Sequence, residues 1–233
     1  MKTLLMGGQA CVLYGAAEFS RDLDLLILVD DDSLSRLRTA LTDLKAEPIA
    51  VPALDAMYLE RGHAVHFRCW REDVAGVRID LMSSLRGVDP FDDLWERRTT
   101  IEVAGESVEL LALKDLVAAK KTQRDKDWPM IRRLVEQDYF ASEERPASER
   151  SEFWLRELRT PELLMEATSA NPEAARRIGQ DRPAVQAALR KNLPDVARAL
   201  EQEELEERRK DRSYWEPLKR ELEEFRRQRR ESQ

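Results

Sequence analysis

The chain has 233 residues, and its 46 acidic side chains outnumber its 39 basic ones, for a net charge of −7. This length allows one large domain or two small ones, and it is sufficient to bury a core without disulfide or metal staples. Because phosphate binding needs a positive surface, the acidic balance excludes a general nucleic-acid coat and leaves only a local basic patch for that purpose.

The longest uncharged run, residues 3–17, is too short to cross a membrane. Two glycines inside it disfavour a secretory signal peptide. The two cysteines, Cys11 and Cys69, are too few for a disulfide framework or a metal quartet, and we interpret them as small core residues. We therefore expect a cytoplasmic protein without a membrane partner.

Up to residue 112 the hydrophobic pattern alternates between strand and helix. A short apolar strand at 4–6 ends in two glycines, and a short helix at 9–14 follows. The apolar run 23–29 predicts a central strand. Ser33 is expected to cap the next helix, whose leucines at 34, 37, 41 and 44 form one buried stripe. The remaining predictions are strands at 65–70 and 77–82, a helical turn at 90–98 and a hairpin around Gly105.

Beyond residue 112 the pattern is helical. We predict helices at 113–121, 128–137 and 152–158, and the polar stretch 141–150 is the expected boundary. The prolines at 161, 172, 183 and 194 each predict the start of a short helix. The C-terminal helix carries an apolar seam formed by Trp215, Leu218, Leu222 and Phe225. We favour docking of this seam on its own domain over a partner helix, because it covers barely two heptads.

The first chemical signal is a pair of aspartates that follows a two-glycine turn. Gly7 and Gly8 end a strand, and glycines let a backbone approach a phosphate closely. Ser20 then precedes Asp22 and Asp24, which share one face of a strand because residues two apart point the same way. Two adjacent carboxylates repel unless a cation lies between them, and oxygen ligands of this kind suit Mg²⁺.

A third carboxylate fits the same pattern. In the strand at 77–82 the apolar residues alternate with Asp80, which therefore faces away from the core. If this strand lies beside the one with Asp22 and Asp24, the three acids converge. Asp80 would then accept a proton from an attacking hydroxyl or share a second metal. The plainer interpretation is that these acids cap turns or line a solvated face.

The basic counterpart is the segment 114–133, which holds seven Lys and Arg against three Asp. Near the break between two predicted helices lie Lys120, Lys121, Arg124 and Lys126, and several of these cations would reach one triphosphate. A site for a nucleotide and Mg²⁺ needs both signs of charge, acids for the metal and bases for the outer phosphates. The alternative is an ordinary charged helix surface.

In this order of motifs the sequence resembles the polymerase-beta-like nucleotidyltransferase superfamily, and within it the AbiEii/minimal nucleotidyltransferase group of toxin–antitoxin and phage-defence systems. The resemblance covers residues 3–137. The residues that carry it are Gly7-Gly8-Gln9-Ala10, Gly15, Ser20, Asp22, Asp24 and Asp80, with Lys120, Arg124, Lys126 and Asp127 matching a Lys-x-x-x-Arg-x-Lys-Asp element.

The resemblance implies an α+β fold, with a nucleotidyltransferase-type mixed sheet flanked by helices and an all-helical C-terminal region. It implies a nucleotidyltransferase domain at 1–140, followed by a helical region at 150–233. The implied metal ligands, also the catalytic acids, are Asp22, Asp24 and Asp80, with Mg²⁺ or Mn²⁺ as the metal. The implied contacts to the NTP co-substrate are Gly7, Gly8, Ser20, Lys120, Arg124 and Lys126. Asp127 would position the bases rather than contact the substrate.

The resemblance further implies transfer of an NMP to a hydroxyl acceptor, either a tRNA 3′ end or a protein side chain. A cognate toxin or antitoxin is a possible partner. Two alternatives stay open, a small-molecule nucleotidyltransferase of the antibiotic-modifying type and a catalytically degenerate member that acts as a binding or antitoxin module.

Overall fold

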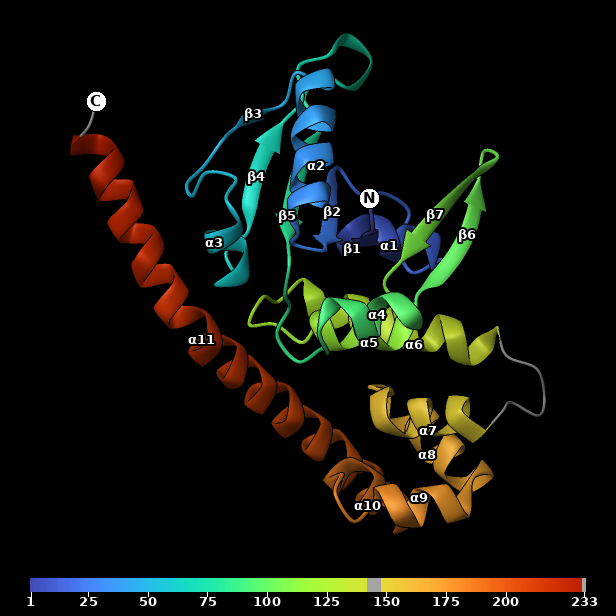
Figure 1. The fold of residues 1–233 in the computed structure, drawn as a ribbon. Coiled ribbons are helices and arrows are strands. Elements are labelled where there is room, and N and C mark those ends of the chain that lie inside the picture. The colour runs from blue at the N-terminus through green and yellow to red at the C-terminus, as the bar shows by residue number, and fades with distance from the viewer. Residues whose placement is uncertain (142–147, 232–233) are drawn as a thin grey trace. The chain divides into compact units, whose positions relative to one another are not determined.

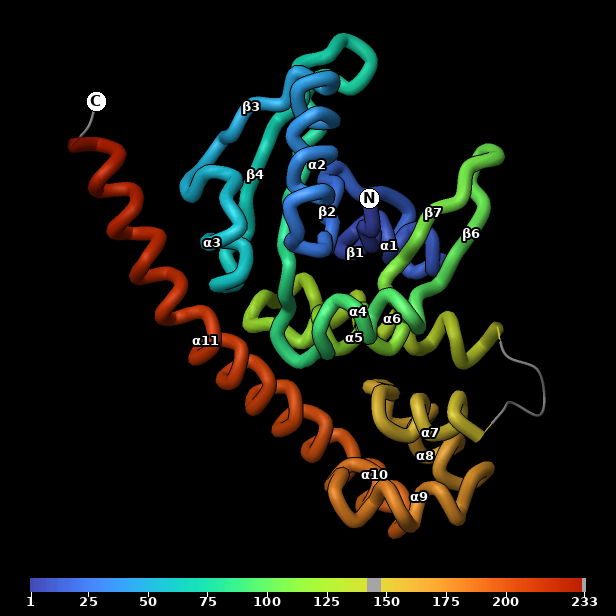
Figure 2. The backbone as a smooth tube through the Cα atoms, in the orientation of Figure 1, coloured from blue at the N-terminus to red at the C-terminus, as the bar shows by residue number. Residues whose placement is uncertain are grey.

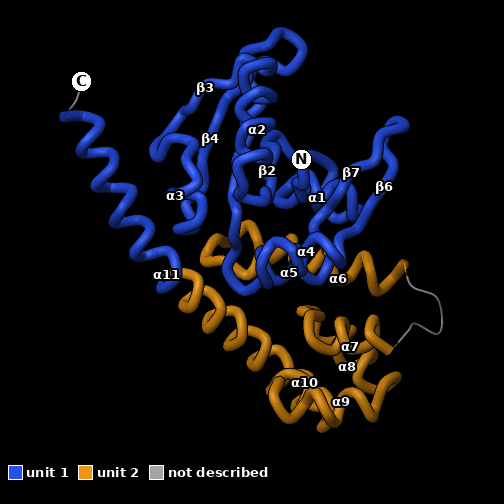
Figure 3. The backbone as a smooth tube through the Cα atoms, viewed as in Figure 1, with its two compact units in different colours: residues 1–119, 213–233 blue, residues 120–212 orange. Residues whose placement is uncertain are grey.

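The computed structural model describes residues 1–141 and 148–231 and divides the chain into two compact units. Unit 1 contains residues 1–119 together with the C-terminal end of the chain from Ser213, and unit 2 contains Lys120–Arg212 (Figure 3). The predicted fold class is confirmed, because a mixed seven-stranded sheet with helices is followed by an all-helical region from α6 to α11.

The sheet of unit 1 has the strand order β3-β4-β5-β2-β1-β7-β6 (Figure 1). Two neighbouring pairs, β2–β5 and β1–β7, are parallel, and the other pairs are antiparallel. Strands β1 and β7 lie side by side although they are distant in sequence (Figure 2). The strand bounds are β1 Thr3–Met6, β2 Asp22–Ile27, β3 Glu47–Pro48, β4 Val65–Arg68, β5 Arg78–Met82, β6 Thr99–Val103 and β7 Glu106–Leu110.

One face of the sheet is covered by helix α2 (Asp31–Asp43). The predicted leucine stripe is largely buried, since Leu34, Leu37 and Leu41 pack with the inward side chains of β4 and β5. The predicted cap is wrong. The cap is Asp30, whose Oδ1 accepts a hydrogen bond from the Ser33 backbone N–H at 2.6 Å. Asp30 precedes the helix in extended conformation, which is the geometry that an N-cap requires.

The remaining elements of unit 1 follow the sequence pattern closely. Helix α1 (Gly7–Leu13) begins at the glycine pair itself, two residues earlier than predicted. The predicted hairpin is confirmed, with Ala104 and Gly105 both at positive φ between β6 and β7, as a tight two-residue turn requires. The other helical segments are α3 Ala56–Glu60, a 3-10 turn Glu72–Val74, α4 Phe91–Glu96 and α5 Leu113–Ala119.

The C-terminal part of α11 (Leu193–Glu231) packs on unit 1. Phe225 makes edge-to-face contacts with Tyr58 and His63, at ring-centroid distances of 5.1 and 5.6 Å. Leu218 is buried close to Gly62. In addition, His63 Nε2 lies 2.7 Å from Glu221 Oε2. The favoured interpretation of the apolar seam is confirmed, because it docks on the chain's own sheet-bearing unit.

Unit 2 is built from short helices and the first part of α11. Their bounds are α6 Asp127–Phe140, α7 Ser148–Glu157, α8 Pro161–Ala170, α9 Pro172–Ile178 and α10 Pro183–Leu189. Three of the four predicted proline starts are confirmed, whereas Pro194 lies at the start of the 39-residue helix α11 instead of a short one. Most of the predicted boundary at 141–150 lies outside the described residues. Among the helices that the structure describes, none has both the length and the apolar character of a membrane span.

Candidate functional site

Three predicted acids lie on one face of the unit 1 sheet. Strands β2 and β5 are parallel neighbours, and their register pairs Asp24 with Asp80 and Asp22 with Arg78. Because Asp22 and Asp24 are two residues apart, both point to the face that carries Asp80. The condition under which the sequence analysis expects the three acids to converge, adjacency of these two strands, is therefore met. The opposite face holds the leucine core under α2, so the acid face is left for polar chemistry.

The two-glycine turn lies directly against the Asp24 carboxylate. Gly7 has φ +66°, and a Cβ added to it would lie 1.9 Å from Asp24 Oδ2. The Gly8 N–H lies 3.4 Å from the same oxygen, a weak contact at most. A Cβ on Gly8 would meet Ser20 Oγ at 2.3 Å. Glycine is required at both positions because the acid and the hydroxyl occupy the space of a side chain.

The Ser20 loop is held against this turn by a side chain of α1. Gln9 Nε2 donates a hydrogen bond to the Ser20 carbonyl oxygen at 2.8 Å. Gly7, Gly8, Ser20 and Asp24 thus form one small cradle at the start of α1. The structure brings together four of the residues that the sequence predicts for metal and phosphate binding.

Asp80 is engaged by two neighbours that the sequence analysis does not assign. Arg78 Nε donates to Asp80 Oδ1 at 2.7 Å, and His66 Nδ1 lies 2.8 Å from the same oxygen. The side chain of Asp80 is only 14% exposed. Burial raises the pKa of Asp80, but the hydrogen bonds from His66 and Arg78 outweigh it and leave the pKa below its ordinary value. Asp80 is therefore a carboxylate at neutral pH.

The alternation of residues along the strands indicates that both neighbours of Asp80, Arg78 and His66, lie on the acid face. Arg78 lies two residues before Asp80 on the same strand, and His66 alternates with the buried Phe67 on β4. A period of two places each of them on the acid face. The pairing of His66 with Asp80 across β4 and β5 is non-local, however, and only the sheet register reveals it.

Asp80→Asn is expected to lower stability at pH 7 by about 1–3 kcal/mol, because it weakens two charge-assisted hydrogen bonds. Since the folded pKa of Asp80 is lowered, its contribution is present above the unfolded value near 4 and is lost as the pH falls through the folded pKa. Urea unfolding of both proteins in chelator, at about pH 7 and about pH 3, measures this. The expectation is contradicted if the difference in unfolding free energy between the wild type and Asp80→Asn stays constant or grows at the lower pH.

A divalent cation fits the donor set at this face. Among the described residues no three His, Cys, Asp or Glu side chains form a ready-made metal cluster. Mg²⁺ does not need one, since it commonly takes one or two carboxylates and fills its octahedron with water and substrate phosphates. The pKa of Arg78 is raised, chiefly by its hydrogen bond to Asp80 and further by the charges of Asp22 and Asp24. All three carboxylates thus act electrostatically on the Arg78 guanidinium, which shows that they lie close enough to share one positive charge.

The predicted triphosphate-binding residues belong to unit 2. Asp127 is buried there, and its carboxylate accepts a hydrogen bond from Arg124 Nε at 2.7 Å and lies 3.8 Å from Lys120 Nζ. Lys126 is exposed at the position before α6. In this loop Asp127 holds the bases, which agrees with a positioning role. Contact of Lys120, Arg124 and Lys126 with a triphosphate stays a prediction.

Comparison with known proteins gives a remote structural likeness. No model of a known protein family matches the chain, and no curated protein matches its sequence significantly. Among solved structures, a match is described as an antigenic nucleotidyltransferase-like protein from Paracoccidioides brasiliensis. It is 19% identical, with a TM-score of 0.37, and the match covers 81% of this chain and 84% of that chain. A likeness at this level is too distant to identify the activity of this chain.

Proposed function

We propose that this chain is a metal-dependent nucleotidyltransferase whose site is the acid face of unit 1. The observation that carries the proposal is the register of Asp24 with Asp80, beside a glycine turn that makes room for the Asp24 carboxylate. Paired carboxylates next to a half-buried glycine turn suit a metal-bound phosphate chain better than they suit a structural role. In this proposal residues 1–140 form the catalytic domain, as the sequence predicts.

The reaction would join an acceptor hydroxyl to the α-phosphorus of an NTP. A bond forms between the acceptor oxygen and the α-phosphorus, the bond from that phosphorus to the bridging oxygen breaks, and pyrophosphate leaves. Mg²⁺ or Mn²⁺, when bound, would neutralise the developing phosphate charge and orient the leaving group. The acceptor hydroxyl loses its proton to solvent or to a nearby base.

The side chains of this chain would hold and orient the reactants. Asp22 and Asp24 would bind the metal, and the Gly7-Gly8 turn with Ser20 would contact phosphate oxygens. A lowered pKa makes Asp80 a weaker proton acceptor, which favours metal binding or the orientation of Arg78 over proton abstraction. Lys120, Arg124 and Lys126 are the predicted contacts to the outer phosphates.

The sequence resemblance supports a tRNA 3′ end or a protein side chain as the acceptor, in a toxin–antitoxin or phage-defence setting. A small-molecule acceptor of the antibiotic type would use the same acids, so an acceptor screen separates these two enzymes. A catalytically degenerate binding module is disfavoured, because Asp22, Asp24 and Asp80 are all present and share one face.

The test is transfer of label from each of the four α-labelled NTPs in Mg²⁺, with total RNA, a protein lysate and a panel of aminoglycosides as acceptor pools. We expect a labelled product that is lost in chelator. Calorimetry of Mg-NTP binding provides a readout that needs no acceptor. The proposal is wrong if no NTP binds and no label transfers, and capture of a stable protein partner under the same conditions would favour the binding-module alternative.

A further inference from the structure

Unit 2 contains a polar hollow of about 390 Å³ at the start of α6. Trp128 and Arg132 of α6, Arg159 between α7 and α8, and Arg208 of α11 line it together with the acids Asp125 and Glu204. Its volume lies within the range of small-ligand sites, roughly 300–1,000 Å³. Three guanidinium groups from three separate segments therefore meet two carboxylates, which leaves the lining positive.

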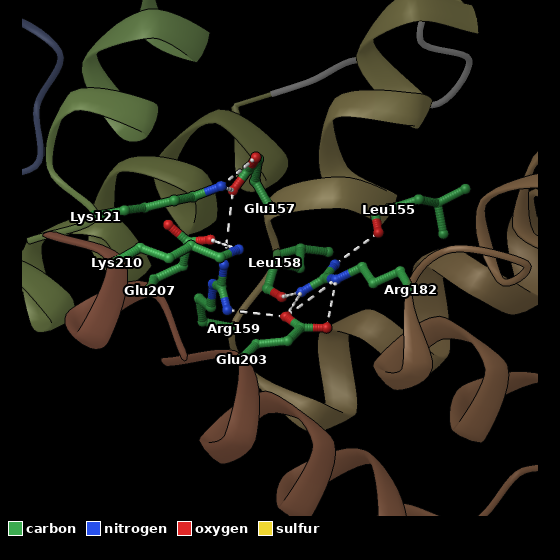
Figure 4. Close-up of polar contacts among 9 residues, drawn as sticks. All are labelled: Lys121, Leu155, Glu157, Leu158, Arg159, Arg182, Glu203, Glu207 and Lys210. Carbon is green, nitrogen blue, oxygen red and sulfur yellow. Dashed lines mark hydrogen bonds and ion pairs between the residues drawn. The ribbon is translucent and has the colours of Figure 1, made fainter. Parts of the chain in front are cut away.

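Arg159 is the buried cation of this hollow. Its side chain is only 10% exposed, and its Nε is buried with no hydrogen-bond partner in the described part of the chain. Burial lowers the pKa of Arg159, and the nearby charge of Arg182 lowers it further. Figure 4 shows both arginines directed at the Glu203 carboxylate, which lies 2.9 Å from Arg159 Nη1 and 3.0 Å from Arg182 Nη2.

Arg159 and Arg182 both pair with Glu203, but Arg182 has more hydrogen-bond partners. Arg182 also donates to the carbonyl oxygens of Leu155 at 2.6 Å and Leu158 at 2.9 Å. Within residues 1–141 and 148–231 no such carbonyl contact is found for Arg159, and Glu157 lies 3.9 Å from its Nη2. A desolvated cation with an incomplete set of partners is costly, and an anion in the hollow would offset that cost.

The other two arginines hold partners that an anion can replace. Arg132 is 57% exposed and pairs with Glu136 within the same helix at 2.8 Å. Arg208 is held more firmly, because it pairs with Glu204 at 2.8 Å and donates to the Gln123 carbonyl oxygen at 3.0 Å. Its third partner is Asp125, at 2.6 Å, whose side chain is 98% exposed, so solvent screens this pair and makes it weak. The contacts to Glu136 and Asp125 are therefore the ones that a more highly charged ligand replaces at little cost, while Glu204 and Gln123 keep the Arg208 guanidinium in place.

The first turn of helix α6 lies at the same place. Free N–H groups at a helix start carry partial positive charge. Here the Asp127 N–H is bonded to the Arg124 carbonyl oxygen at 3.2 Å and Pro129 has no N–H, so the side chains and not the backbone supply most of the positive charge. Trp128 of this first turn is covered by the guanidinium groups of Arg159 and Arg208, at 5.4 and 5.7 Å from its ring centroid. The indole therefore fixes the cations in place around the hollow.

We propose that this hollow binds a phosphate group, held by Arg132 and Arg208 above the buried charge of Arg159. Guanidinium groups match phosphate oxygens in a bidentate geometry, and a doubly charged phosphate offers more than the carboxylates that it replaces. The phosphate belongs either to a free nucleotide or to an RNA backbone. Because the hollow needs no metal, the inference is independent of the proposed nucleotidyl transfer.

The test is calorimetric binding to the full chain in chelator, which removes any metal-dependent site. The probes are pyrophosphate, AMP and a single-stranded RNA of about ten nucleotides. Arg132→Gln is expected to weaken phosphate binding about tenfold, since it removes one charge-assisted contact. Arg156→Gln is the matched control, because Arg156 is 55% exposed, lies on α7 away from the hollow and has an acidic neighbour one helical turn away, Glu152, at 4.0 Å.

Loss of affinity in Arg132→Gln but not in Arg156→Gln would support the site, and the tighter probe would identify the source of the phosphate. Arg208→Gln is a second variant, with circular dichroism to verify its fold. Equal binding by the wild type and Arg132→Gln, or no binding of any probe by the wild type, would overturn the inference. A loss confined to Lys126→Gln would also overturn it, because the phosphate would then bind to the preceding loop.

Discussion

Asp24→Asn is expected to lower nucleotidyl transfer by about 10³-fold, because a metal held by carboxylates stabilises the transition state by several kcal/mol and each 1.36 kcal/mol is a factor of ten. Asparagine keeps the shape of the side chain beside Gly7 and Gly8, so the fold and the cradle are retained. The change removes the charge that faces Asp80 across β2 and β5. The measurement is single-turnover transfer of labelled NMP, with calorimetry of Mg-NTP binding alongside.

Asp43→Asn is the matched control for this experiment. Asp43 is exposed at the C-terminal end of α2, on the helix that covers the opposite face of the sheet. Its loss removes the same charge from the same unit without touching the acid face, and we expect full activity. Wild-type activity in Asp24→Asn would contradict the proposed site, whereas an equal loss in both variants would point to a general charge effect.

Gly7→Ala is expected to destabilise the protein by about 2–5 kcal/mol and to abolish Mg-NTP binding. An L-residue at positive φ costs roughly 1–2 kcal/mol, and forcing a methyl group into occupied space adds about 1–3 kcal/mol. The methyl group would lie 1.9 Å from Asp24 Oδ2 and would push the carboxylate out of register with Asp80. Urea unfolding and calorimetry measure the two effects separately.

Gly76→Ala separates backbone strain from the clash. Gly76 has φ +88°, but nothing lies within 4 Å of the position that its Cβ would occupy. Gly76→Ala should therefore lose only about 1–2 kcal/mol of stability, from backbone strain, and should bind Mg-NTP normally. If Gly7→Ala were no worse than Gly76→Ala in stability and bound nucleotide equally well, the close approach of Asp24 to the turn would have no functional meaning.

Patterns confined to one element were predictable from the sequence. The leucines of α2 recur with the helical period, and the stripe that they form is largely buried. The hairpin of β6 and β7 follows from a glycine between two alternating runs. The capping residue of α2 is not predictable from the sequence, because Ser33 and each aspartate in the run before it have a side chain that caps helices.

The candidate site was predictable only in part, because the period of a strand is a local property whereas the pairing of strands is not. A strand period of two places Asp22 and Asp24 on one face without further information. The convergence with Asp80 depends on the pairing of β2 with β5, which are separated by α2, β3, α3 and β4 in the chain. The engagement of Asp80 by His66 and Arg78, and hence its lowered pKa, depends on that same non-local register.

The sequence by itself determined the elements, the burial side of each and the types of residue available for chemistry, because backbone geometry repeats over short distances. Tertiary structure alone decided which acids and cations share one face of the sheet. It also decided how closely the Asp24 carboxylate packs against the glycine turn and where the C-terminal apolar seam docks. It also assembled Arg132, Arg159 and Arg208 around one hollow from three segments. These contacts join residues far apart in the chain, and no local periodicity encodes which of the many apolar faces will pair.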